Sequence, residues 1–460
     1  MSDLLVFSVL AACMLWALRE PWIGVITWSW VSLMSPHVLI GWRAASWPVA
    51  SGVALCTLIG LLLTRKRQNP FVGSAVWALL AFTLWITITL PFSMYFDEAL
   101  PLWERSMKIF LMLFVTLSLI DTRRKLDVFV GINVVSIGFY GVKGGIFTIL
   151  TAGAYRVWGP GGFIAGNNEL ALAVVTTIPL IRYLQLQFKV RWMRLAAGVA
   201  MGLCVVTALG TYSRGALLGL AAMSAYFWIQ SRKKVQRGVL ILVVGAAALA
   251  LMPEQWFSRM DTIGDYSADD SALGRINAWW MAWNLAKDNV FGGGFMIYYA
   301  PVFQKYSPDP SRVHAAHSIY FQVMGEHGFI GLLLFLLIGV LTWLSARSLI
   351  KAGRANASHR WAADLGAMVQ VSMVGYAVAG AFLSLSYFDL PYNVMAMSVL
   401  ALYFVRRDDE AARAAARAGL SVNAPADWAV NAAGRPAVPH RAVALPRGPA
   451  AAPEPQHDRP

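Results

Sequence analysis

Three of the seven histidines of the chain lie where a long polar segment gives way to an apolar one: His314, His317 and His327. The ordinary pKa of a histidine lies close to working pH, so its imidazole can act as a general base. His317 comes just before an expected helix and is the candidate base, with a structural role as the alternative. His314 is a candidate substrate-binding neighbour or a plain loop residue. His327 and the adjacent Glu326 are expected to make packing hydrogen bonds.

Positive charges also stand at or inside apolar segments, where they are costly unless they are paired or used. Arginine forms bidentate contacts with phosphate oxygens, whereas lysine acts as a point charge. We expect all of these cations on the same side of the membrane as His317, so they predict a cleft for a phosphate or pyrophosphate. The set is Arg105, Lys108, Lys143, Arg156, Arg214 and Arg275.

Several of these cations also have a structural interpretation. Arg105 and Lys108 would snorkel toward lipid headgroups. Lys143 would form an ion pair with Glu169. Arg214 would hold a tight turn through backbone carbonyls. The residues alone leave these alternatives open.

A pair of asparagines, Asn167 and Asn168, opens an apolar segment after the compact sequence Gly159–Gly162. Asparagine is a favoured N-cap residue, so one of the pair is expected to cap the helix. The alternative is that their amides bind sugar hydroxyls.

The composition decides what kind of elements must position these residues. The chain has 460 residues, of which 58% are hydrophobic and 13% are charged. A soluble protein would have about a quarter of its residues charged. Apolar runs of about 20 residues recur, which is the length of a membrane-spanning helix. The sequence therefore predicts an all-α polytopic membrane protein.

Charge and cysteine usage exclude other classes of protein. The formal charge of +14 comes from short basic loops, as membrane topology requires, so nucleic acid is not an expected partner. Cys13, Cys56 and Cys204 all lie in apolar segments and offer neither metal-ligand spacing nor a disulfide framework. No cleavable signal peptide is expected at the N-terminus.

The basic loops place both termini in the cytoplasm by the positive-inside rule. About twelve spans are expected, two of them within the first 64 residues. The chain then divides into four parts: an N-terminal bundle (1–252), a large periplasmic loop (253–316), C-terminal helices (317–405) and a cytoplasmic, largely disordered tail (406–460). The other ten spans are expected near 71–94, 106–120, 127–150, 168–186, 195–212, 215–231, 238–252, 326–346, 364–384 and 389–405.

The large loop contains one amphipathic pattern, Gly274–Lys287, that is rich in tryptophan. Trp279, Trp280 and Trp283 suit a helix that lies at the lipid headgroups. Arg275 begins this helix, where backbone N–H groups would add to an anion site. The alternative for Arg275 is a surface charge.

Three short stretches, in this order, resemble the O-antigen ligase and polymerase superfamily. The resemblance covers about residues 1–405. Two further stretches, 140–145 and 155–160, are similar to a branch of exosortase-associated O-glycosylation ligases. Ser318 stands where many members have asparagine, and both residues can cap a helix. The three stretches are 213–216, Gly274-Arg275 followed by Trp279, and 316–320 followed by 326–332.

The resemblance implies a GT-C-like glycosyltransferase of the bacterial inner membrane. It would transfer a glycan from undecaprenyl pyrophosphate to an acceptor hydroxyl, with inversion. Arg214 and Arg275 would bind the pyrophosphate and His317 would be the general base. No metal or cofactor is expected, and the chain has no acidic cluster with Mg²⁺-like spacing near the cations. Lipid A–core is the expected acceptor, with a protein hydroxyl or a growing glycan as alternatives.

Two other classes of function remain to be separated from this one. A transporter of an anionic lipid predicts deep charges and related halves. Lys143 is the one good deep candidate, and no related halves are evident. A non-catalytic scaffold for envelope assembly would make His317 and the arginines dispensable.

Overall fold

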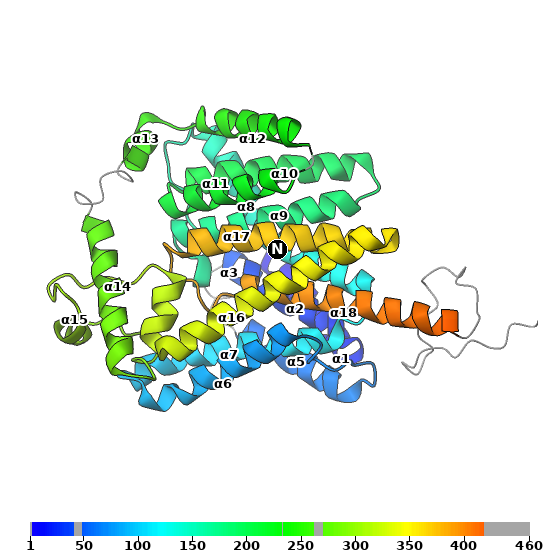
Figure 1. Cartoon of the computed structure of the whole chain (residues 1–460), viewed down its shortest axis with the longest axis horizontal. Helices are drawn as coiled ribbons and strands as arrows, with labels where there is room; N and C mark the ends of the chain where they lie inside the picture. Colours follow the sequence, from blue (N-terminus) through cyan, green and yellow to red (C-terminus); the bar gives the residue numbers. More distant parts are fainter. Residues whose placement is uncertain (1, 41–47, 232, 262–269, 418–460) are drawn as a thin grey trace, which may run out of the picture.

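The computed structural model describes residues 2–40, 48–231, 233–261 and 270–417, and every regular element in these ranges is a helix. Most of the helices run side by side in one bundle (Figure 1). This confirms the predicted all-α class. The predicted tail disorder falls mainly on residues 418–460, which lie outside the described residues.

Six helices in the described part are long and apolar enough to cross a membrane, and the bent pair Lys234–Leu249 and Glu254–Asp261 makes up to seven. This supports a polytopic membrane protein. Shorter apolar helices are Leu4–Arg19, Val49–Leu63 and Arg214–Ile229. The six are Ser74–Phe92, Arg123–Leu150, Asn167–Gln187, Arg191–Gly210, Ile319–Ala355 and Ala357–Gly380.

The helices follow the chain in the order in which the apolar segments occur. In the N-terminal half they are α1 (Ser2–Arg19), α2 (Pro21–Met34), α3 (Pro36–Ile40), α5 (Val49–Leu63), α6 (Ser74–Ile88), α7 (Phe96–Leu119), α8 (Arg123–Leu150), α9 (Asn167–Gln187), α10 (Arg191–Gly210), α11 (Arg214–Ile229) and α12 (Lys234–Leu249). After them come α13 (Glu254–Asp261), α14 (Asp270–Asp288), α15 (Ala300–Tyr306), α16 (Ile319–Ala355), α17 (Arg360–Gly380) and α18 (Asp389–Arg417).

Close approach between helices depends on small residues, as is usual in membranes. A Cβ added to Gly145 of α8 would lie 2.4 Å from the carbonyl oxygen of Leu203 in α10. A Cβ added to Gly366 of α17 would lie 2.6 Å from the carbonyl oxygen of Ala346 in α16. Backbone-to-backbone contacts of this kind fix how the neighbouring spans lie against each other.

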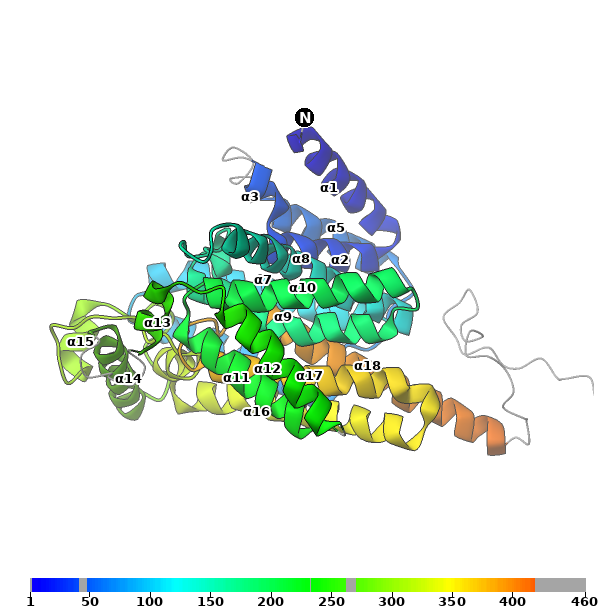
Figure 2. The ribbon, with the colours of Figure 1, turned by 90° about the horizontal axis from the view of Figure 1, so that it is seen from above.

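One end of the bundle is covered by three helices, and the longest of them, α14, crosses the ends of the spans. Both views place α13, α14 and α15 at this end (Figures 1 and 2), which we call the α14 end. Ala278, Met281 and Leu285 of α14 are fully buried, whereas Trp280 and Trp283 are exposed. The helix predicted at Gly274–Lys287 is therefore present, and it begins four residues earlier, at Asp270.

Two helices begin seven or more residues before their predicted spans, both at the α14 end. Helix α7 begins at Phe96 instead of near residue 106, with Asp97 and Glu98 in its first turn, where the helix dipole favours negative charge. Helix α16 begins at Ile319 instead of near residue 326 and is kinked at Gly328 (φ 70°, ψ −174°). A Cβ there would lie 2.1 Å from the carbonyl oxygen of Val290, so glycine is required.

Candidate active site

Helix α14 holds the segment that carries the candidate base. The Asn277 side chain, nearly buried, donates to the carbonyl oxygens of Asp309 (2.8 Å) and Arg312 (2.9 Å). The amide of Asp309 donates back to Asn277 Oδ1 (3.0 Å). Trp279 Nε1 donates to the carbonyl oxygen of Ala316 (2.7 Å). These four hydrogen bonds fix the backbone on the N-terminal side of His317.

His317 occupies a bend just before α16. Its φ of 42° lies in the left-handed region, which is strained for a residue with a Cβ. Its ring lies 5.1 Å from the ring of His314, centroid to centroid. Within the described part of the chain, its buried Nδ1 has no hydrogen-bond partner. The backbone therefore helps to position the imidazole, and its Nδ1 is not engaged by a hydrogen bond.

The surroundings of His317 keep its imidazole neutral. Burial lowers its pKa, and the nearby Arg275 and His314 lower it further, to about 4. Because this value is far below neutral pH, the ring carries no proton that would block it as a base. His317 can therefore accept a proton, although a pKa of about 4 makes it a weak base.

Arg275 lies within the first two turns of α14, and its charge reaches two other elements. Its charge acts on His317, as the lowered pKa indicates, and on the carboxylate of Glu169 at the start of α9. The preceding Gly274 packs on His314, where an added Cβ would lie 2.9 Å from Cδ2 of the ring. The starts of α9, α14 and α16 thus meet around one arginine.

The turn between α10 and α11 adjoins the start of α9. Tyr212 has φ 58°, and its hydroxyl donates to the carbonyl oxygen of Gly153 (2.7 Å). Ser213 caps α11 by accepting from the amide of Ala216 (3.2 Å). Asn167 Nδ2 donates to the carbonyl oxygen of Thr211 (2.7 Å). This fixes Arg214, the first residue of α11, beside the helix start that carries Glu169.

The asparagine pair does not cap α9, so that prediction was wrong. Gly166 occupies the N-cap position and no side chain bonds there. Asn167 instead joins α9 to the α10–α11 turn, and Asn168 is half-buried on the first turn. Ser318 does occupy the N-cap position of α16, but its hydroxyl forms no cap bond and has no partner among the described residues.

Three of the other predicted cations have local partners. Arg156 is exposed, and its guanidinium lies 5.5 Å from the centroid of the Tyr212 ring. The Arg105 guanidinium lies 3.6 Å over the ring of Phe163. Lys108 pairs with Glu104 one turn earlier (3.5 Å), and both side chains are about half exposed. Arg156 therefore adjoins the Arg214 turn, whereas Lys108 is engaged along its own helix.

Lys143 lies apart from this cluster. It is exposed on α8, on the same face as the exposed Phe139, Ile146 and Phe147. About seven residues separate it from the helix end, which is roughly 10 Å along the axis. The charge that acts on Glu169 is that of Arg275, so the predicted Lys143–Glu169 ion pair receives no support.

Two buried residues beyond His317 stabilise the kinked start of α16. Glu326 accepts from the Tyr387 hydroxyl (2.6 Å) and from Gln322 (3.5 Å). His327 Nδ1 lies 2.8 Å from Thr89 Oγ1. The predictions of packing hydrogen bonds for Glu326 and His327 are confirmed.

Sequence reasoning missed three contributors to the site. Glu169 was considered only as an alternative partner of Lys143, whereas the charge of Arg275 acts on it. Asp389, whose charge acts on Arg105, was not considered. Asn277 was also missed. It shares the buried face of α14 with Ala278, Met281 and Leu285, and a polar residue on the apolar stripe of an amphipathic helix was the signal that could have found it.

The arrangement brings a neutral imidazole, an arginine that faces it and a second arginine on an adjoining helix start to one end of the bundle. Guanidinium groups bind phosphate oxygens, and the imidazole can take a proton from a hydroxyl. The part of the chain that the structure describes contains no group of three or more His, Cys, Asp or Glu side chains placed to hold a metal ion.

Comparison with known families gives two matches. Residues 171–336 match the family described as O-antigen ligase. Residues 1–188 match a family of unknown function. No curated protein matches the chain. The first match spans α9 to the first half of α16 and includes Arg214, Arg275, His314 and His317.

Proposed function

Since the chain belongs to the O-antigen ligase superfamily through residues 171–336, we propose that it transfers a glycan from undecaprenyl pyrophosphate to an acceptor hydroxyl. The observation that carries this proposal is that Arg275, in the first two turns of α14, is close enough for its charge to act on His317. A pyrophosphate on the arginine would place the anomeric carbon of its glycan near the imidazole.

The proposed reaction is an in-line displacement. The acceptor oxygen attacks the anomeric carbon and gives its proton to His317. The bond between the anomeric carbon and the phosphate oxygen breaks, and undecaprenyl pyrophosphate leaves with the electron pair. Arg275 and Arg214 stabilise the negative charge that develops on this leaving group. Attack from the opposite face inverts the configuration.

Donor binding would also raise the basicity of His317. In the free protein the Arg275 cation is one of the causes that lower its pKa. A pyrophosphate bound to Arg275 would offset that cation and add negative charge near the imidazole, which favours the protonated form. The base would thus become stronger when the substrate that needs it is bound.

We place the α14 end of the bundle in the periplasm and the chain in the bacterial inner membrane, with both termini cytoplasmic and about twelve crossings. The basic loops at the opposite end support this orientation. The shorter apolar helices α1, α5 and α11, together with α7, α12 and α18, would then cross with the six longer ones. The exposed Trp280 and Trp283 of α14 suit a position at the lipid headgroups.

The test is reconstitution of the full chain with a glycan on undecaprenyl pyrophosphate, in EDTA. Lipid A–core is the acceptor that we propose, and a protein hydroxyl and a growing glycan are assayed beside it. We expect an inverted glycosidic product with lipid A–core. Product with another acceptor alone would move the proposal to a protein O-oligosaccharyltransferase or a polymerase. Movement of the donor across the membrane without any product would contradict glycan transfer and support an anionic lipid transporter.

A further inference from the structure

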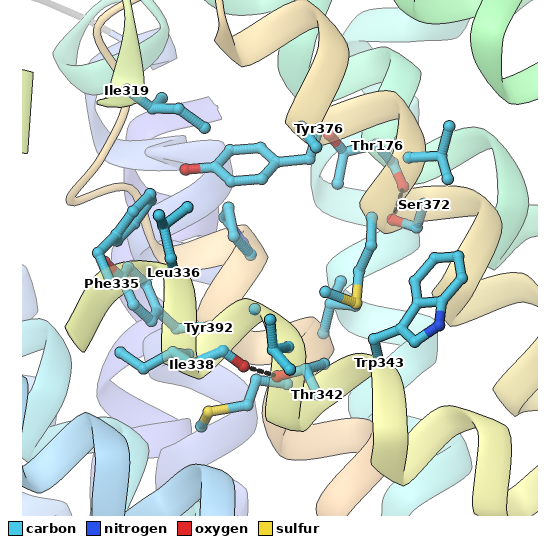
Figure 3. A pocket seen from close by; sticks show the side chains of 18 of the residues that line it. Thr176, Ile319, Phe335, Leu336, Ile338, Thr342, Trp343, Ser372, Tyr376 and Tyr392 are labelled. Atoms are coloured by element: carbon cyan, nitrogen blue, oxygen red, sulfur yellow. Dashed lines mark hydrogen bonds between the residues drawn. The ribbon is translucent and has the colours of Figure 1, made fainter. Parts of the chain in front are cut away.

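A cavity of about 360 Å³ lies between α16, α17 and α18, with Thr176 of α9 at its side (Figure 3). Ile319 and Tyr320 line it, only two and three residues after His317. From there it extends along α16 to Trp343 and along α17 to Ser372. The cavity therefore lies among candidate spans and begins next to the proposed site.

The side chains that line the cavity are mostly apolar, and none of their hydroxyl groups is left without a hydrogen-bond acceptor. The lining contains no charged side chain, and each of its hydroxyl groups donates to a backbone carbonyl oxygen. Tyr320 bonds across to α17, Tyr376 and Tyr392 bond to the loop before α18, and the serine and threonine hydroxyls bond to helix backbone. These pairs are Tyr320 to Ala377, Tyr376 to Leu385, Tyr392 to Ser386, Ser372 to Thr176, Thr342 to Ile338 and Thr176 to Leu172.

A glycine of α16 leaves room on one side of the cavity. Gly339 lines the cavity, and a Cβ added there would meet no atom within 4 Å. Leu336 and Val340, also in the lining, are 42% and 55% exposed, so the cavity reaches the outer surface of the bundle. A chain could enter from the surrounding lipid without opening the helices.

We propose that this cavity holds a stretch of the polyprenyl chain of the donor lipid; this rests on the proposed function. The donor carries its hydrocarbon directly on the pyrophosphate, so a headgroup beside Arg275 and His317 leaves its chain at the mouth formed by Ile319 and Tyr320. At about 360 Å³ the cavity is at the small end of ligand pockets, which suits one narrow chain and not the several acyl chains of a glycolipid.

The contribution to binding is one of packing and placement. Lipid tails are as apolar as the cavity, so moving the chain into it gains no hydrophobic free energy. The chain instead fixes where the pyrophosphate stops relative to His317. We therefore expect the cavity to have a moderate effect on the affinity for ligands that carry a polyprenyl chain, and no effect on the affinity for ligands without one.

The test uses Gly339→Phe, which fills the cavity, in the full chain reconstituted in lipid nanodiscs. Two probes are compared: undecaprenyl pyrophosphate, and inorganic pyrophosphate, which has the charge and no tail. We expect the Kd for undecaprenyl pyrophosphate to rise about three- to tenfold and that for inorganic pyrophosphate to stay unchanged. The control is Gly202→Phe in α10, where an added Cβ also meets no atom within 4 Å; it should change neither.

Two results would overturn this inference. One is unchanged binding of undecaprenyl pyrophosphate to Gly339→Phe, and the other is an equal loss for both probes, which would mean a distorted headgroup site. Gly339→Ala, which adds one methyl group, checks that the change itself is tolerated. A selective loss in a chain that transfers no glycan would retain the cavity assignment and refute the proposed function, so the two failures are distinguishable.

Discussion

The charge of Arg275 acts on His317, and the donor that we propose would change this interaction. Burial, then Arg275 and then His314 hold the pKa of His317 at about 4, so the free protein has a neutral but weak base. The pyrophosphate that we propose on Arg275 would reverse the sign of the local field. The strained backbone of His317 (φ 42°) would keep the ring in place while this happens.

The pH dependence of transfer should report this change. Falling pH protonates His317 and removes the base, so activity is lost on the acid side. The acid limb of kcat/KM for the donor, which reflects the free protein, should lie near the pKa of about 4. The acid limb of kcat, which reflects the donor complex, should lie at a higher pH. Steady-state rates between pH 3.5 and 8 measure both limbs, and a kcat limb at or below the kcat/KM limb would contradict the coupling.

Helix α14 is the element that positions the loop before His317. It contributes Arg275, and through Asn277 and Trp279 it holds the backbone that leads to His317. Trp279 also stacks on Phe321 of α16, with 4.9 Å between the ring centroids. The distance between the proposed phosphate-binding and proton-accepting groups therefore depends on how this one helix packs.

Asn277→Ala should separate positioning from overall folding. It removes three hydrogen bonds to the 309–312 backbone, which we expect to cost about 1–3 kcal/mol of stability. Because small misplacements of catalytic groups are costly, kcat should fall about ten- to a hundredfold. Donor titration and thermal melting accompany the rate measurement.

The matched control is Asn284→Ala on the same helix. Asn284 donates to the carbonyl oxygen of Tyr306 (2.9 Å), in the α15 region and away from His317. Its loss should lower stability without changing kcat beyond about twofold. Equal effects of the two substitutions on kcat would show that Asn277 acts on folding alone.

The positions of the helices could be predicted where a single sequence feature, such as a long apolar run, was clear. Length and hydropathy located the interior of most helices, and tryptophan spacing located α14. The early start of α7 was missed because Asp97 and Glu98 give its first turn a polar sequence. The start of α16 was missed because the predicted span began at Glu326, which left residues 319–325 in the loop. In the structure the acids of α7 favour its N-terminus, and Glu326 and His327 of α16 are satisfied by tertiary partners.

The whole molecule gathers ionisable groups from distant parts of the chain at the α14 end (Figure 1). That His317, Arg214 and Arg275 share one end of the bundle was predictable from the order of the helices, and the membrane side of that end stays a prediction. Specific pairs were not: Glu169 faces Arg275, and Arg105 lies on Phe163, through contacts between residues more than 50 positions apart. Such pairs depend on helix rotation and packing, which the hydropathy of one segment does not encode.

The orientation of the bundle can be measured by cysteine labelling. Ser311 and Ser358 are both exposed and lie at opposite ends, before α16 and before α17. In a variant with the three native cysteines replaced, a membrane-impermeant maleimide applied to spheroplasts should label Ser311→Cys. Ser358→Cys should react only after permeabilisation. The reverse pattern would place His317 in the cytoplasm and contradict the proposed donor side.

The central claim is that His317 accepts the proton of the acceptor and is not a donor-binding residue. His317→Asn tests it best, because asparagine lacks the imidazole and tolerates the left-handed backbone at this position. Single-turnover transfer and donor binding are measured on the same reconstituted protein. We predict a rate loss of about 10²- to 10⁴-fold with a donor Kd within about threefold of the unsubstituted protein. Transfer at the unsubstituted rate would contradict the claim, and so would a loss explained entirely by weaker donor binding.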